Sequence, residues 1–170
     1  MYDLHSILIQ LKKEDTPLHG VMVRCVRCFY QRLDPTLREG SALFELWEQE
    51  LELIYGDLRQ RLSPNAKTDT GALGDRFGFD APPELPRLLQ SIQTFYSVLI
   101  KLIAWNTLRG ATPEPPLTEL LSGRAFVNRG IRNFCGDDWY IWPLDVWDPA
   151  LETQCEELRV CLVSFDTCPE

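Results

Sequence analysis

Apolar residues recur along most of this chain at the spacing of an amphipathic α-helix. Residues 4–11 place leucine or isoleucine at positions i, i+3, i+4 and i+7, so these side chains share one helical face. Related spacing returns in four further stretches, residues 17–33, 42–62, 85–109 and 149–165. We therefore predict an all-α fold, with a single helical domain of five or six helices spanning residues 1–170.

Polar residues followed by proline mark two of the predicted helix starts. Thr16 precedes Pro17 and Asp148 precedes Pro149, so each pair combines an N-cap side chain with proline at the first helical position. Gly110 follows the longest patterned stretch and is the predicted stop for that helix. These signals give the helices defined ends.

Two segments lack helical periodicity. Residues 63–84 are rich in glycine, proline, asparagine and aspartate, and we expect one long loop there. Their "GALGDRFG" run has neither a preceding strand nor a closing Lys-Ser/Thr, so it does not indicate a nucleotide-binding loop. Residues 124–147 carry closely spaced aromatic side chains, and we expect an irregular Trp-rich segment with one short strand pair near 125–142.

The charge of the chain is unevenly distributed. Residues 137–170 hold nine acidic residues and one basic residue, a net charge of −8 that equals the net charge of the whole chain. Such a surface repels phosphates, so we expect this chain alone to bind DNA weakly. Six arginines remain as possible nucleic-acid contacts: Arg24, Arg27, Arg32, Arg124, Arg129 and Arg132. The acidic end has a second interpretation, a surface that binds a basic protein partner.

The N-terminus does not resemble an export signal, because an acidic residue precedes the apolar run and the lysines follow it. The longest nearly uncharged stretch, "LLQSIQTFYSVLI", is too short to span a bilayer. We therefore predict a cytoplasmic protein that does not associate with membranes. In that compartment the six cysteines are expected to be buried thiols, and Cys25-x-x-Cys28 lacks the second ligand pair of a zinc site.

The chain offers no convincing catalytic constellation. It has no Gly-x-Ser-x-Gly, His-Glu-x-x-His, P-loop or Rossmann motif. Asp137 and Asp138 are adjacent, so in extended chain they point to opposite sides and do not form an acid–base pair. Lys101 lies among apolar neighbours, and we interpret it as a residue at the core boundary, with a functional amine as the alternative. We assign no catalytic, cofactor-binding or metal-ligating residue to this chain.

The aromatic residues of the Trp-rich segment have two interpretations. They are a platform on which unpaired bases stack, or a cover that closes the hydrophobic core. Stacking platforms need a basic groove, whereas this segment is acidic, so core closure is the expected role. The residues concerned are Phe134, Trp139, Tyr140, Trp142 and Trp147.

The order of several motifs resembles the N-terminal helical region of large adenine-specific (N6) DNA methylases of restriction-modification and phage-defence systems. Trp47 and Tyr55-Gly56 match the end of one helix of that region, and a Tyr-x-x-Leu-x-x-Leu-Ile helix follows, here Tyr96, Leu99, Leu102 and Ile103. A Gly-Ile-x-Asn-Phe-x-Glu-x-Asp-x-Phe-x-Trp motif comes next. Its matching residues, which we expect to have a structural role, include Gly130, Asn133, Phe134, Asp138 and Trp142. Gly136 and Tyr140 depart from the pattern.

This resemblance implies a function that the motifs do not show by themselves. In such methylases a catalytic core follows the helical region and carries an S-adenosylmethionine pocket and an Asn/Asp-Pro-Pro-Tyr/Phe motif. Neither occurs in this chain, where "DAPPEL" at residues 80–85 is the nearest approach. We therefore expect a non-catalytic accessory domain that scaffolds a methyltransferase core and contacts DNA weakly at most. The alternative is a free-standing helical protein–protein interaction module with an acidic C-terminal surface.

Overall fold

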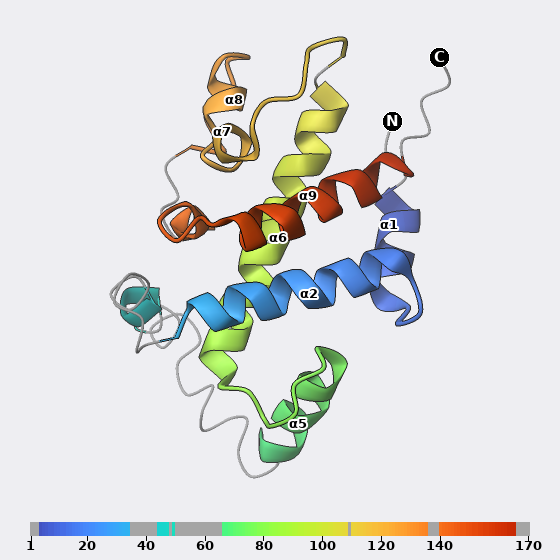
Figure 1. Cartoon of the computed structure of the whole chain (residues 1–170), viewed down its shortest axis with the longest axis vertical. Helices are drawn as coiled ribbons and strands as arrows, with labels where there is room; N and C mark the ends of the chain where they lie inside the picture. The colour runs from blue at the N-terminus through green and yellow to red at the C-terminus, as the bar shows by residue number, and fades with distance from the viewer. Residues whose placement is uncertain are drawn as a thin grey trace.

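The structure, a computed structural model, is all-α, as the hydrophobic spacing predicts (Figure 1). It describes residues 4–34, 44–47, 49, 66–108, 110–135 and 140–165. The helices are α1 (Leu4–Lys12), α2 (Pro17–Arg32), α5 (Ala66–Arg76), α6 (Leu85–Leu108), α7 (Leu117–Leu121), α8 (Arg124–Val127), the 3-10 helix η2 (Trp142–Leu144) and α9 (Pro149–Val163). Residues 44–47 are also helical.

The long helix α6 forms the centre of the molecule, and α2 and α9 cross it side by side in opposite directions (Figure 1). Phe29 of α2, Phe95 of α6 and Leu158 of α9 are fully buried in the shared core. Helices α7 and α8 pack near the C-terminal end of α6, whereas α5 lies near its N-terminal end (Figure 1). Helices α2 and α9 pack on α6 along its length and α7 packs near its C-terminal end, so much of the broad apolar surface of α6 is buried.

The predicted helix starts are confirmed. The Thr16 side chain accepts a hydrogen bond from the His19 backbone N–H, and the Asp148 side chain accepts one from the Leu151 backbone N–H. In both helices proline occupies the first turn, where its missing N–H leaves no hydrogen bond unmade. Gly110 has a φ of +55° just beyond α6, as expected for a glycine that ends a helix.

The long loop predicted for residues 63–84 is wrong in part, because it contains helix α5. Gly71 and Gly74 weaken the helical signal of this stretch, since glycine is a poor helix former. A Cβ atom at Gly74 would lie 2.6 Å from Cδ of Pro83, so close packing requires glycine there. The expected strand pair near 125–142 is also wrong for the described residues of that range, which form α8, turns and the start of η2.

Two of the predicted apolar stripes are only partly buried. In α1, Ile7 and Leu11 are buried, whereas Leu4 and Leu8 are exposed. Leu46 is likewise exposed, although its neighbours Phe44 and Trp47 stack in the core. The remainder of the helix predicted for residues 42–62, including the Tyr55-Gly56 motif, lies outside the described residues.

By length and composition, α6 is apolar enough to cross a membrane, with a mean hydropathy of 1.2 over its best 18 residues. Residues 88–100, which are by themselves too short to span a bilayer, thus belong to a longer apolar helix. Of that window, 56% is buried inside the protein, which is the burial expected of a core helix.

Candidate functional site

The Trp-rich segment reaches the centre of the core through Trp142. This indole is 2% exposed and packs edge-on against Phe29 of α2, with 5.9 Å between ring centroids. Its Nε1–H donates to Oγ1 of Thr94 on α6 at 3.0 Å, and the Thr94 hydroxyl donates to the Gln90 carbonyl at 2.8 Å. One side chain of the motif therefore links α2, α6 and η2, with its polar atom satisfied.

Phe134 has a similar structural role at the other end of the motif. Its ring lies 4.4 Å from that of Phe126 on α8, which in turn meets Trp105 of α6 edge-on at 5.9 Å. The backbone carbonyl of Phe134 approaches Gly123, which has a φ of +82°. A Cβ atom at Gly123 would overlap that carbonyl oxygen, so the docking of the motif depends on glycine at this position.

The remaining motif residues have different positions. Gly130 has a φ of +77° in the turn after α8, which fits the glycine of the motif. Asn133 is exposed, and the described contacts include no hydrogen bond of its side chain that would support its expected structural role. Asp138, together with Asp137 and Trp139, lies outside the described residues.

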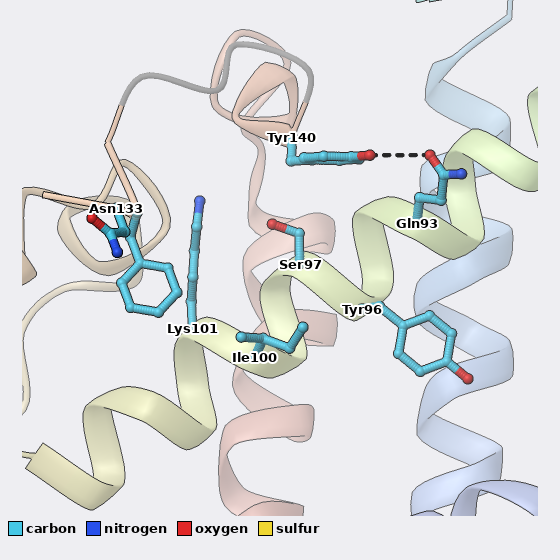
Figure 2. A pocket seen from close by; sticks show the side chains of 8 residues that line it. Gln93, Tyr96, Ser97, Ile100, Lys101, Asn133 and Tyr140 are labelled. Carbon is cyan, nitrogen blue, oxygen red and sulfur yellow. Dashed lines mark hydrogen bonds between the residues drawn. The ribbon is translucent and has the colours of Figure 1, made fainter. Parts of the chain in front are cut away.

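A pocket of about 470 Å³ lies between α6 and the two described edges of this segment (Figure 2). Figure 2 shows the Tyr140 ring above Ser97, with the Tyr140 hydroxyl donating to Oε1 of Gln93 at 3.1 Å. Lys101 rises on the opposite side, next to Asn133. The described lining residues thus supply hydroxyl, amide and ammonium groups but no carboxylate or imidazole, so these residues by themselves form no carboxylate–imidazole acid–base pair.

Lys101 is not at the core boundary as predicted, because only 5% of it is exposed. Its Nζ donates to the backbone carbonyl of Leu121 at 2.6 Å. That carbonyl belongs to the last residue of α7, where helical carbonyls lack intrahelical partners. The ammonium group therefore fastens the end of α7 to α6, a role that sequence reasoning missed.

The arginines of α2 contact other parts of this chain. Arg24 pairs with Glu157 of α9 at 2.7 Å, and Arg32 contacts both carboxylate oxygens of Asp148 at 2.6 and 2.7 Å. Arg27 lies over the ring of Phe79 at 5.8 Å. Two of the three predicted basic contacts of α2 are therefore paired with carboxylates at α9 within the fold.

The other candidate arginines lie near α8. Arg129 donates to the Leu108 carbonyl and the Thr112 hydroxyl and lies 5.2 Å from the Trp105 ring centroid. Arg124 and Arg132 are exposed. Among the six candidate arginines, only the guanidinium groups of Arg124 and Arg132 have no described contact within the chain.

Three titratable groups where α2 meets α9 have shifted pKa values. The pKa of Asp148 is lowered, first by the Leu151 backbone N–H and then by Arg32, because both interactions favour the carboxylate. Burial raises the pKa of Cys155 to about 12 and raises that of Cys25, so both thiols stay protonated at neutral pH. The cysteines of α2 and α9 are unpaired thiols, and the described residues contain no cluster that could hold a metal ion.

Comparison with known proteins identifies no relative of this chain: no protein-family model, no curated protein and no solved structure matches it. The resemblance to adenine-specific DNA methylases therefore rests on the motifs quoted above.

Proposed function

We propose that this chain is a non-catalytic helical accessory domain of an S-adenosylmethionine-dependent, adenine-specific DNA methyltransferase. In this role it scaffolds the catalytic core and contributes little to DNA affinity. S-adenosylmethionine binds only to that core. The proposal combines the motif resemblance with the positions of the motif residues in the fold.

The observation that carries the proposal is the use of the motif in packing. Trp142 and Phe134 are the two matching aromatic residues of the motif with described contacts: Trp142 joins α2 to α6, and Phe134 packs against α8. A signature used in this way supports an architectural role, because residues that bind substrate would present their polar atoms to an open site. The Trp142 N–H is instead satisfied by Thr94 inside the core.

The direct test is an activity measurement on a methyltransferase core. The reading frame beyond Glu170 and the adjacent genes are first searched for an Asn/Asp-Pro-Pro-Tyr/Phe core. That core is then expressed with and without residues 1–170, and adenine methylation is followed with labelled S-adenosylmethionine. We expect methylation to require both parts, and residues 1–170 alone to bind no S-adenosylmethionine in calorimetry.

Two results would contradict the proposal. One is binding of S-adenosylmethionine or methylation by residues 1–170 alone. The other is a core whose activity and stability are the same without this domain.

A second candidate function is a free-standing protein–protein interaction module. The observation that favours it is a set of exposed apolar side chains on the outer helices, among them Leu4 and Leu8 of α1 and Val160 and Val163 of α9. Exposed apolar residues of this kind mark interaction surfaces when they gather beside a groove. A genome with no methyltransferase core encoded nearby would favour this function over the first.

A further inference from the structure

An open groove runs between the N-terminal half of α2 and the length of α9. Its volume is about 980 Å³, and it is lined by residues between Pro17 and Arg24 and between Pro149 and Cys161. The two helices lie side by side and run antiparallel (Figure 1). Such a pair presents parallel ridges with a furrow between them, the surface on which a third helix packs.

The middle of the α2 side of this groove has no side chain. Gly20 lies in the interior of α2, where glycine costs roughly 0.5–1 kcal/mol relative to alanine. A Cβ atom there would meet only Nη1 of Arg24, at 3.5 Å. The helix backbone is therefore open to close approach by another chain at this point.

The α9 side of the groove offers apolar surface to a partner. Val160 is 64% exposed, the highest exposure among the large hydrophobic residues of the described chain. Pro17 and Pro149 add exposed apolar surface at the two ends of the groove. An amphipathic partner would remove this surface from water.

The groove has a small excess of acidic side chains, three carboxylates against two guanidinium groups. It contains Glu152, Glu156 and Glu157 against Arg24 and Arg159. Arg24 pairs with Glu157 and Arg159 with Glu156, while Glu152 has no described partner. Both groups of the Arg24–Glu157 pair are partly exposed, so this pair is weak and Glu157 can exchange it for a pair with an incoming cation. Arg159 is more buried and also pairs with Glu114, but the Glu156 carboxylate is itself partly exposed.

We propose that this groove binds an amphipathic α-helix of a partner protein, with an apolar stripe flanked by lysine or arginine. The apolar stripe covers Val160 and approaches Gly20, and the basic residues lie against Glu152 and Glu156. This inference rests on the proposed scaffolding function and assigns the surface through which the domain engages its partner. The excess carboxylate, Glu152, favours a basic helix over nucleic acid as the occupant.

The test uses three synthetic peptides and fluorescence anisotropy on residues 1–170. The basic peptide carries leucines at i, i+3, i+4 and i+7 with flanking lysines, the acidic peptide has glutamates instead, and the third is the basic peptide in scrambled order. We expect the basic peptide to bind with a Kd on the order of 10⁻⁵ M. The acidic and scrambled peptides should bind at least about tenfold more weakly, and salt should weaken the basic peptide's binding several-fold.

Two groove variants locate the binding site, each with a matched control on α5. Gly20→Leu fills the furrow and should weaken binding about tenfold, while Gly71→Leu, whose added Cβ meets nothing within 4 Å, should not. Glu152→Lys should weaken binding about fivefold, while Asp75→Lys should not. Leucine is a better helix former than glycine, so circular dichroism should show both glycine variants folded.

Equal affinity for the basic and acidic peptides would overturn the inference, and so would equal effects of the groove and control variants. These outcomes are separate from those of the proposed function. A groove that fails to bind the peptide leaves the methylation result unchanged, whereas a domain that does not support methylation can still bind the basic helix.

Discussion

A single Cβ atom at Gly123 would disrupt the docking of the aromatic motif onto α8. The residue has a φ of +82°, and an added Cβ would lie 2.7 Å from the Cys135 Sγ and overlap the Phe134 carbonyl oxygen. We predict that Gly123→Ala lowers the free energy of unfolding by about 2–4 kcal/mol, because backbone strain and overpacking act together. Urea denaturation followed by tryptophan fluorescence measures this loss.

Gly110→Ala is the matched control for that substitution. Gly110 also has a positive φ, +55°, but an added Cβ would meet nothing within 4 Å. Its loss should be about 1 kcal/mol, the cost of the backbone conformation alone. Equal losses at the two glycines would contradict the packing explanation.

Sequence reasoning at this scale succeeded where the physical cause is local. The caps Thr16 and Asp148 were predictable because each acts on backbone groups three residues away. The roles of Gly123 and Thr94 were not predictable. Gly123 meets the Phe134 carbonyl and Thr94 meets the Trp142 indole, and only tertiary packing brings these distant residues together.

At the scale of elements, Asp148 both caps α9 and ties it to α2 through Arg32. We predict that Asp148→Ala lowers the free energy of unfolding at pH 7 by about 1 kcal/mol, the usual effect of losing an N-cap. The lowered pKa gives this stabilisation a pH dependence, present above the ordinary value of 3.8 and lost as the pH falls through the lower folded value. Denaturation series between pH 7 and pH 2.5 measure it.

The difference between the wild-type chain and Asp148→Ala should therefore shrink below about pH 4. Asp145→Ala is the control, since this exposed carboxylate has no described side-chain contact. A difference between wild type and Asp148→Ala that is constant over the whole pH range would show that the carboxylate's charge does not stabilise the folded state.

Helices α1, α2, α6 and α9 could be predicted from sequence, because all four have helical apolar spacing and the last three also have recognisable starts or stops. Helix α5 could not, since its two glycines hide a helix that tertiary contacts stabilise. The burial of the apolar stripe of α1 was overestimated, because periodicity indicates which face is apolar but not how much of that face another helix covers.

At the scale of the whole molecule, Arg24 and Arg32 of α2 are paired with carboxylates at α9, and the chain keeps a net charge of −8. We therefore predict that the chain binds duplex DNA more weakly than about 10⁻⁴ M at 150 mM salt, at the weak end of non-specific binding. Residual binding at 50 mM salt should fall in an Arg124→Ala/Arg132→Ala variant. An Arg24→Ala/Arg27→Ala variant should leave it unchanged, and anisotropy with labelled DNA measures both.

Micromolar affinity at 150 mM salt would contradict this charge balance. So would a larger loss from the α2 arginines than from Arg124 and Arg132. Sequence could give the total charge and the six arginines but not their pairing, because Arg24 and Glu157 are 133 residues apart.

The central claim is that the Trp-rich segment holds the helices together, and Trp142 tests it most directly. Urea unfolding of Trp142→Ala should show a loss of about 3–5 kcal/mol, because the buried indole joins α2 to α6. Trp142→Phe is the variant to use if the alanine variant does not fold. It keeps an aromatic ring but not the hydrogen bond to Thr94, and its free energy of unfolding should be about 1–2 kcal/mol lower than that of wild type. Unfolding free energies within about 0.5 kcal/mol of wild type for both variants would contradict the account.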